Sequence, residues 1–239
     1  MNSPYGFPVI DSCLNCSVQK SGYSCTFSAG LRSEFDRCSH PATYPEKATL
    51  MVESQPPHGV YILCAGQVKL TSTSKEGKSV IMRIVQPGEF LGLSAVVSNT
   101  PCLANAETIT PCQTRFVSQK DFLRLMQQHV ELSMQVAKAL SREYASACRE
   151  IRSLALTSSS AGRLASLLLS WCPPASAKRA ALEIRIKSGF THEEIASMIG
   201  ITRETVTRTF SEFKRNGILD LKGSTLVVRN IEALESLAA

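Results

Sequence analysis

Residues 190–219 read FTHEEIASMIGITRETVTRTFSEFKRNGIL, and this stretch decides the fold of the C-terminal part of the chain. Thr191 is followed three residues later by Glu194, a pattern typical of a helix whose first turn is capped by a hydroxyl group and a carboxylate. Apolar residues then recur at three- and four-residue steps until Gly200, which marks a turn. Thr202 provides a second hydroxyl cap. The stretch therefore predicts two short helices joined by a tight turn.

The second predicted helix has an apolar and a polar face. Val206, Phe210 and Phe213 fall on the side that packs inward. Arginine presents a bidentate fork to guanine and glutamate accepts a hydrogen bond from cytosine, so such residues at an exposed helix start can read bases in a major groove. The candidate DNA-reading residues are Thr202, Arg203, Glu204, Thr207 and Arg208. The alternative is a solvated helix face.

This helix and the residues after it resemble the recognition helix and the start of the wing in the catabolite activator/FNR (Crp/Fnr) family of bacterial transcription regulators. The resemblance rests on residues 202–208 (TRETVTR), Phe210 and residues 216–219 (NGIL). It implies a regulator and not an enzyme. It also implies three partners, which are a palindromic double-stranded DNA site with TGA-containing half-sites, a second copy of the chain and RNA polymerase.

The resemblance assigns roles within the predicted DNA-binding module. Glu204 and Arg208 match the residues that contact the TGA core of each half-site, and Arg203 matches a residue that adds a guanine contact. After the helix, residues 221–228 (LKGSTLVV) alternate around a Lys-Gly-Ser turn and predict a β-hairpin. The C-terminal part is therefore expected to be a winged helix-turn-helix.

Length and composition indicate two domains. The 239 residues are 44% hydrophobic, which is enough for two cores. The net charge is +6, as expected for a chain that meets phosphate. No apolar run approaches the roughly 20 residues of a membrane span, and the first residues lack a secretory pattern. We therefore expect a cytoplasmic protein with no membrane partner.

Short alternating runs separated by glycine-containing turns occupy residues 51–116 and predict a β-roll or jelly roll. The predicted strands are residues 59–63, 66–70, 80–85 and 113–116. The resemblance implies that this is an effector domain of the cyclic-nucleotide-binding type. In members that bind cyclic nucleotides, a second Gly-Glu holds the ribose and an Arg-Ser or Arg-Thr pair holds the phosphate.

This chain departs from that pattern. Gly92 is followed by Leu93, and residues 100–104 (TPCLA) contain no arginine to pair with a phosphate. A cyclic nucleotide or haem in the β-roll therefore remains the second hypothesis for the signal.

The N-terminal stretch is rich in cysteine and poor in apolar periodicity. A Cys13-x-x-Cys16 pair with Cys25 nearby can bind a metal ion or an iron–sulfur cluster. Zinc bound with the help of Cys38 or His40 is one alternative, and thiols without a ligand are another. Thiol oxidation, or a redox enzyme or electron carrier, would also use these cysteines, but no flavin or nicotinamide glycine motif is present.

FNR-type members carry a similar pair, a third N-terminal cysteine and a distant fourth that Cys112 matches. The resemblance therefore implies that Cys13, Cys16, Cys25 and Cys112 hold an oxygen-labile [4Fe-4S] cluster that favours the dimer. Eight residues separate Cys16 from Cys25, more than is usual in the family, so the third ligand is either Cys25 or Cys38.

A long helix is predicted from residue 130 to residue 156, because apolar residues recur at helical steps with no proline or glycine between them. Such a seam either packs under its own domain or pairs with a second copy. The family uses it as the dimer interface, which would contain Leu132, Val136, Leu140, Ala147, Ile151 and Leu154. The whole chain is thus expected to be α+β.

Four parts are predicted along the chain. They are a cysteine-rich sensor segment, a β-roll, a dimerisation helix and a winged helix-turn-helix, at residues 1–40, 41–128, 129–157 and 158–239. Residues 74–78 form a short charged turn within the β-roll. The resemblance implies that Lys75 and Glu76 in this turn contact polymerase, and the alternative is an ordinary solvated hairpin.

Overall fold

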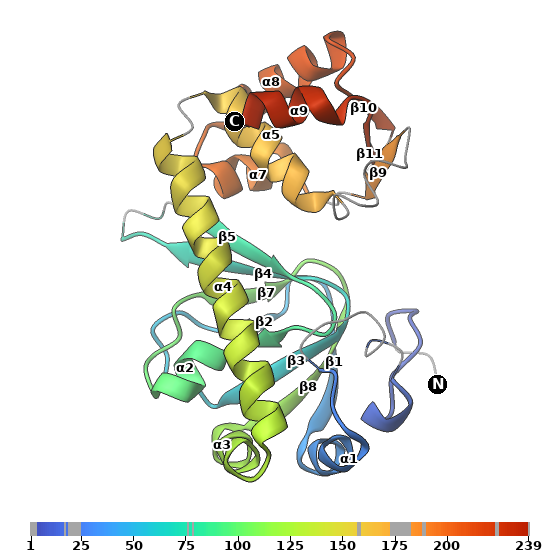
Figure 1. Ribbon diagram of the computed structural model, residues 1–239, viewed down its shortest axis with the longest axis vertical. Helices are drawn as coiled ribbons and strands as arrows, with labels where there is room; N and C mark the ends of the chain where they lie inside the picture. The colour runs from blue at the N-terminus through green and yellow to red at the C-terminus, as the bar shows by residue number, and fades with distance from the viewer. Residues whose placement is uncertain are drawn as a thin grey trace. The chain divides into compact units, whose positions relative to one another are not determined.

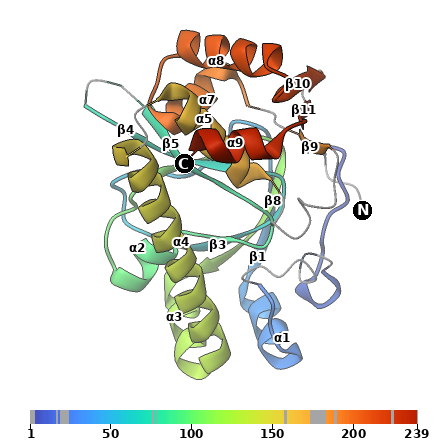
Figure 2. The same cartoon turned by 45° about the horizontal axis from the view of Figure 1, so that its top comes forward.

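The computed structural model describes residues 4–16, 18, 25–75, 77, 79–156, 159–172, 183–187, 190–222 and 225–238. These residues form two compact units, residues 1–145 and 146–239, which are drawn in Figures 1 and 2. The first contains a β-roll and most of a long helix, and the second contains a helix-turn-helix. The predicted α+β class is confirmed. In the described part of the chain, no helix is both long and apolar enough to cross a membrane.

The β-roll consists of two four-stranded sheets. The first has the order β1 (His40–Tyr44), β8 (Cys112–Ser118), β3 (Gly59–Ala65), β6 (Phe90–Leu91). The second has the order β2 (Thr49–Met51), β7 (Asn105–Thr108), β4 (Val68–Thr73), β5 (Ser79–Val85). Residues from both sheets form one apolar cluster that fills the inside of the roll, namely Leu50, Leu63, Val68, Val85, Leu91, Ala106 and Cys112.

The other face of the first sheet packs against helices. The helices of the first unit are α1 (Ala29–Cys38), α2 (Leu93–Ser98), α3 (Gln119–Gln128) and α4 (Val130–Leu156), with a short 3₁₀ turn, η1, at Cys13–Asn15. The predicted long helix is confirmed as α4. Helix α1 was not predicted, because its sequence is mainly polar and buries only Leu31 and Phe35. These two side chains join Val60 and Ile62 of β3 in a second apolar cluster.

The second unit is a three-stranded sheet with helices around it. Its elements are α5 (Ser160–Trp171), β9 (Ile184–Lys187), α7 (His192–Ile199), α8 (Arg203–Arg215), β10 (Leu219–Lys222), β11 (Thr225–Val228) and α9 (Ile231–Ala238). Strands β10 and β11 pair as the predicted hairpin, and β9 joins β11 on the other side. The turn residues 223 and 224 lie outside the described residues.

Candidate functional site

The start of α7 is held by the predicted capping box. The Thr191 hydroxyl accepts a hydrogen bond from the Glu194 N–H at 3.2 Å, and the Glu194 carboxylate accepts one from the Thr191 N–H at 2.9 Å. Gly200 ends the helix with a left-handed φ of 67°. The Thr202 hydroxyl then accepts from the Thr205 N–H and caps α8. Local hydrogen bonds therefore set both ends of the turn.

Helix α8 presents its polar residues to solvent. Val206, Phe210 and Phe213 are buried in the core of the second unit, as predicted. Arg203, Glu204, Thr207 and Arg208 are exposed. Hydrogen bonds from its own N–H and from the Thr202 hydroxyl lower the pKa of Glu204, so its carboxylate is ionised and can accept from a cytosine amino group.

One residue of this module was missed by the sequence analysis. The His192 ring stacks on Phe210 with ring centroids 5.1 Å apart, and its Nδ1 lies 2.8 Å from the Thr207 hydroxyl. The Thr207 hydroxyl also donates to the Arg203 carbonyl at 3.0 Å. Thr207 is thus engaged within the protein, and Arg203, Glu204 and Arg208 remain as the outward-facing set. The histidine directly after the Thr191 cap was the available signal.

Four cysteines line one small cavity in the first unit. Cys13, Cys16 and Cys25 come from the N-terminal segment and Cys64 comes from β3. The cavity has a volume of about 20 Å³ and is also lined by the Arg115 side chain of β8. Phe27 and Ile62 make the rest of the wall mainly apolar.

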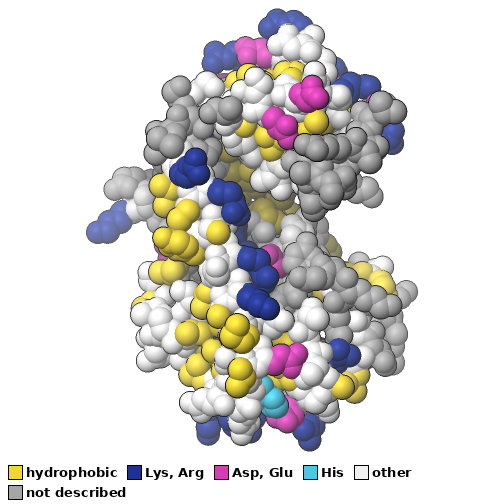
Figure 3. All heavy atoms as spheres, viewed as in Figure 1, with side chains coloured by type: hydrophobic (Ala, Val, Ile, Leu, Met, Phe, Trp, Pro, Cys, Tyr) yellow, Lys and Arg dark blue, Asp and Glu magenta, His cyan; other side chains and the backbone are white. Residues whose placement is uncertain are grey.

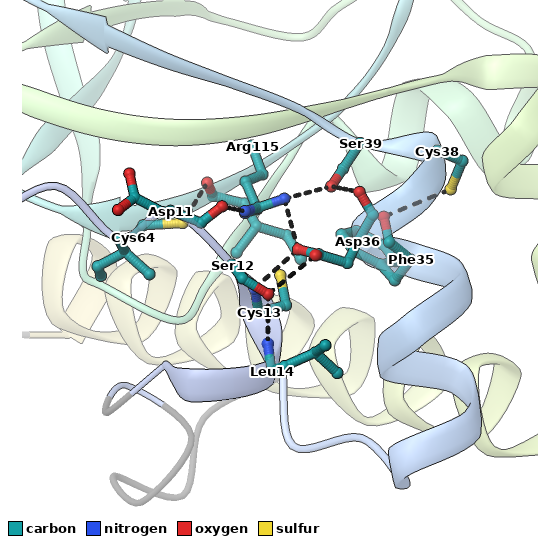
Figure 4. A network of polar contacts seen from close by, with 12 residues as sticks. Asp11, Ser12, Cys13, Leu14, Phe35, Asp36, Cys38, Ser39, Cys64 and Arg115 are labelled. Atoms are coloured by element: carbon teal, nitrogen blue, oxygen red, sulfur yellow. Dashed lines mark hydrogen bonds and ion pairs between the residues drawn. The ribbon is translucent and has the colours of Figure 1, made fainter.

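Arg115 joins the N-terminal segment to the sheet. Its guanidinium is 2% exposed and forms an ion pair with Asp36 of α1 at 2.8 Å. It also donates to the Asp11 carbonyl at 2.6 Å and to the Ser39 hydroxyl at 2.9 Å (Figure 4). The Arg115 Nε is buried and has no hydrogen-bond partner among the described residues.

Two residues, Asp36 and Gln113, make four further hydrogen bonds that fix the segment. Asp36 accepts hydrogen bonds from the Cys13 N–H at 2.8 Å and the Ser12 hydroxyl at 2.9 Å. Gln113 of β8 accepts from the Ile10 N–H and donates to the Ile10 carbonyl, both at 2.8 Å. None of these polar partners was identified from the sequence, because each is more than twenty residues away from the atom that it binds.

Cys112 lies away from the other predicted ligands. Its thiol is fully buried inside the roll and donates to the Gln67 and Thr110 carbonyls at 3.3 and 3.1 Å. The predicted set of Cys13, Cys16, Cys25 and Cys112 is therefore not brought together. Cys38 and His40, which the zinc alternative would use, are outside the lining of the cavity.

Burial controls the charge of these thiols. It raises the pKa of Cys13 to about 12, although the positive charge of Arg115 acts in the opposite direction. It raises the pKa of Cys25 to about 11. Binding of a metal centre would therefore release protons, because thiolates are the ligands. Within the described residues, no three Cys, His, Asp or Glu side chains are placed to hold a single metal ion.

The ligands of a four-iron cluster lie further apart than the ligands of a single ion, because each thiolate binds a different iron. Four thiols around one apolar cavity, with a buried N–H donor that has no partner in the described part of the chain, are suited to such a group. The cavity volume of about 20 Å³ would have to increase for a cluster to fit.

The predicted dimer seam divides between two faces of α4. Leu132 and Val136 are buried in the core of the first unit. These two residues therefore pack within their own domain and are not available to a second copy. Leu140 is partly buried there, and Ala147 and Ile151 are exposed. The side chain of Leu154 lies outside the described residues. Among the described residues, the large apolar side chains of this helix that are exposed are Val130, Met134, Tyr144 and Ile151, and Figure 3 shows apolar and basic side chains along it.

The predicted polymerase turn connects β4 and β5. Lys75 is exposed, and the Gly77 N–H donates to the Ser74 carbonyl at 2.9 Å. Glu76 lies outside the described residues.

Comparison with known proteins identifies both units. Residues 162–237 match the Crp-like helix-turn-helix domain, and residues 41–129 match the cyclic nucleotide-binding domain. The chain belongs to the Crp/Fnr family. The CRP-like cAMP-activated global transcriptional regulator of Mycobacterium tuberculosis is 28% identical over 196 residues, which cover 81% of this chain and 86% of the relative. The cAMP-activated global transcriptional regulator CRP of Haemophilus influenzae is 29% identical over 192 residues, covering 79% and 84%.

Solved structures support the fold of this Crp/Fnr protein. FixK2 from Bradyrhizobium japonicum superposes with a TM-score of 0.73 at 22% identity, covering 84% of this chain and 98% of FixK2. A CooA mutant from Carboxydothermus hydrogenoformans gives a TM-score of 0.71 at 20% identity, covering 89% and 91%. Since the curated relatives are transcription regulators and not enzymes, this Crp/Fnr protein is a DNA-binding transcription regulator. Members of the family bind DNA as dimers and contact RNA polymerase.

Proposed function

We propose that this regulator acts in the cytoplasm, reads a palindromic DNA site with Arg203, Glu204 and Arg208, and responds to oxygen or redox state through an iron–sulfur cluster on its N-terminal cysteines. The gathering of the N-terminal thiols around one cavity carries the proposal. When bound, the cluster would supply reactivity toward oxidants. The other steps belong to the residues of the chain.

The DNA-reading step is supported by the exposed start of α8. Arg208 and Arg203 each offer a bidentate donor for guanine, and the ionised Glu204 offers an acceptor for cytosine. We assign Glu204 and Arg208 to a TGA-containing half-site. Two copies of the chain would place their α8 helices in successive major grooves about one helical turn apart.

The dimerisation step would use α4. Its exposed apolar residues Val130, Met134, Tyr144 and Ile151 recur on one side of the helix and extend the predicted Ala147 region. Leu132 and Val136 support this surface from beneath, because they anchor α4 to the β-roll.

The signalling step would couple the cysteine site to the β-roll. The Cys13 N–H donates to Asp36, and Asp36 forms an ion pair with Arg115 of β8. A displacement of the cysteines would therefore strain the contacts that hold the segment on β8. Loss of the bound group would release the segment and change its packing against the β-roll. Metal binding and local folding are then linked equilibria.

Anaerobic purification of the full chain tests this proposal. We expect about four iron and four sulfide per chain, together with broad visible absorption and tight binding to a palindromic TGA site in a gel-shift titration. Exposure to air should remove the absorption and weaken specific DNA binding together. A protein without iron and sulfide, whose DNA binding is the same in air, would contradict the sensor.

A cyclic nucleotide in the β-roll is the second candidate, and it is favoured by the match of residues 41–129 and by the cAMP-activated relatives. Against it, Leu93 is buried in an apolar core where the family pattern has a carboxylate, and Cys102 and Ala104 are buried in the stretch where it has an arginine. Calorimetric titration with cAMP and cGMP separates the two hypotheses. Saturable binding that strengthens DNA affinity would favour the nucleotide.

A further inference from the structure

The position of Cys64 leads to a more specific assignment. We propose that Cys64 of β3, and not Cys112 of β8, is the fourth thiol of the N-terminal set with Cys13, Cys16 and Cys25. The assignment as an iron ligand rests on the proposed iron–sulfur function, whereas the position of Cys64 beside the other three thiols can be tested without iron.

The pleat of the sheet places Cys64 on the correct face. Ile62 of β3 lies directly opposite Arg115 of β8 in the antiparallel pairing, so these side chains project from the same face. Cys64 follows Ile62 by two residues and belongs to the same apolar cluster on the helix-covered side. Its thiol thus lies on the face that carries Arg115.

The same alternation places Cys112 on the opposite face. It lies three residues before Arg115, an odd number, so the two side chains project to opposite sides of β8. Cys112 accordingly packs inside the roll with Leu63 and Leu91. The sheet itself separates its sulfur from the N-terminal cysteines.

A β-bulge sits where β3 presents Cys64. Leu63 pairs with Thr114 and Ala65 pairs with Gln113, so β3 advances two residues while β8 advances one. Cys64 is the additional residue. Bulges re-aim side chains and are found preferentially next to functional sites, and this one lies under the N-terminal segment.

Cys112 has no simple route to the other face. Its sulfur packs so tightly on Gly66 that a Cβ added to this glycine would come within 2.5 Å of it. Moving it across the sheet needs a one-residue slip of β8, and such a slip reverses the facing of every side chain on the strand. Gln113 and Arg115 would then lose their contacts with the N-terminal segment.

Arg115 provides an independent indication of a ligand in the cavity. Its Nε is buried without a partner among the described residues, although an unpaired buried donor is costly. A thiolate or sulfide sulfur beside it would accept this hydrogen bond, and the guanidinium charge would offset part of the negative charge of four thiolates. Arg115, Cys13 and Cys64 all line the same cavity.

Anaerobic reconstitution of matched serine variants tests the assignment. Cys64→Ser should lose most of the iron and the visible absorption, whereas Cys112→Ser, which keeps a donor for the Gln67 and Thr110 carbonyls, should retain both. Cys102→Ser, at a buried cysteine away from the cavity, is the control for folding. Retention of iron by Cys64→Ser, or its loss from a folded Cys112→Ser, would overturn the assignment.

Chemical cross-linking of the iron-free full chain keeps the two proposals distinguishable. A short thiol-specific bifunctional reagent such as dibromobimane should join Cys64 to Cys13, Cys16 or Cys25, as read by peptide mass spectrometry. Cross-links from these cysteines to Cys112 in place of Cys64 would overturn the assignment whatever the iron content. If Cys64 is cross-linked but the wild-type chain takes up no iron, the iron–sulfur function fails while the position of Cys64 stands.

Discussion

The helix-turn-helix and the N-terminal cysteine segment are held in place by different kinds of contact. In α7 and α8, the capping hydroxyl accepts a hydrogen bond from an N–H three residues further along the chain, as Thr191 does from Glu194. The described part of the cysteine segment is held by Arg115 and Gln113, which lie about one hundred residues further along the chain. The proposed DNA-reading face is therefore built locally, whereas the proposed cysteine site forms only when the β-roll has folded.

This difference indicates how each region can serve a regulator. A locally built reading face keeps its geometry whatever the signal is, because its caps and core residues are all in one module. A segment held by a few long-range polar contacts can be released without unfolding the sheet beneath it. Substitutions should therefore separate the two, with effects on stability at the segment and effects on DNA at α8.

The largest effect is expected from Asp36→Ala. The substitution leaves the buried Arg115 guanidinium without its carboxylate partner, so the free energy of unfolding should fall by about 3–5 kcal/mol. Urea denaturation followed by circular dichroism measures this, and hydrogen exchange should place the loss in β1 and β8. Glu46→Ala, which removes an exposed ion pair with Lys47, is the matched control and should change little. Equal effects of the two variants would show that the Asp36–Arg115 ion pair does not hold the segment.

The pH dependence of the Asp36–Arg115 ion pair provides a second test. Burial raises the pKa of Asp36, but hydrogen bonds from Cys13 and Ser12 and the charge of Arg115 outweigh this, so its pKa lies below the usual value. Its stabilisation is therefore complete above the unfolded pKa of about 3.9 and is lost as the pH falls through the folded pKa. Asp36→Asn should be less stable than wild type at neutral pH, and this gap should close on acidification. A gap that is independent of pH would exclude the carboxylate as its source.

Arg208→Ala should act on DNA and not on stability. Loss of one bidentate base contact weakens specific binding by about 1–3 kcal/mol per half-site, while binding to random DNA changes less. Gel-shift titrations on a TGA palindrome and on random DNA provide the ratio. Arg215→Ala, at the other end of α8, removes the same charge away from the proposed reading residues and should affect both DNAs alike. The base-reading role is excluded if Arg208→Ala does the same.

Thr191→Ala should have a smaller, local effect. It removes the hydroxyl that accepts the Glu194 N–H, and such a cap contributes about 1 kcal/mol. Hydrogen exchange should show faster opening of α7 with no change at the cysteine segment, and Thr191→Ser should restore protection. Faster hydrogen exchange in β8 as well would show that the helix-turn-helix is not independent of the β-roll.

The smallest effect on binding is expected at the β4–β5 turn. Replacing Lys75 and Glu76 by alanine should leave DNA affinity and stability unchanged, because Lys75 is exposed. Transcription in a reconstituted assay should nevertheless fall if polymerase contacts this turn. Unchanged transcription would leave it as a solvated hairpin.

The structural features of this protein that have local causes could be predicted from the amino-acid sequence. The caps at Thr191 and Thr202, the apolar spacing of α4 and α8, and the hairpin of β10 and β11 all arise from contacts between near neighbours, and all are confirmed. Apolar residues that recur with a period of 3.6 or of two residues, and a hydroxyl residue before a helix, can be recognised in the sequence alone.

Which cysteines lie around the cavity depends on tertiary contacts and could not be predicted from the sequence. Cys64 and Cys112 look alike in the sequence, and the family resemblance favoured Cys112. Their facing depends on the register of β3 against β8 and on one bulge, both of which come from pairing over about fifty residues. In the same way, the burial of Leu132 and Val136 reflects what the β-roll places beneath α4. A shift of one residue in the strand register moves a side chain to the opposite face of the sheet. That register is set by pairing with residues that are distant in the chain.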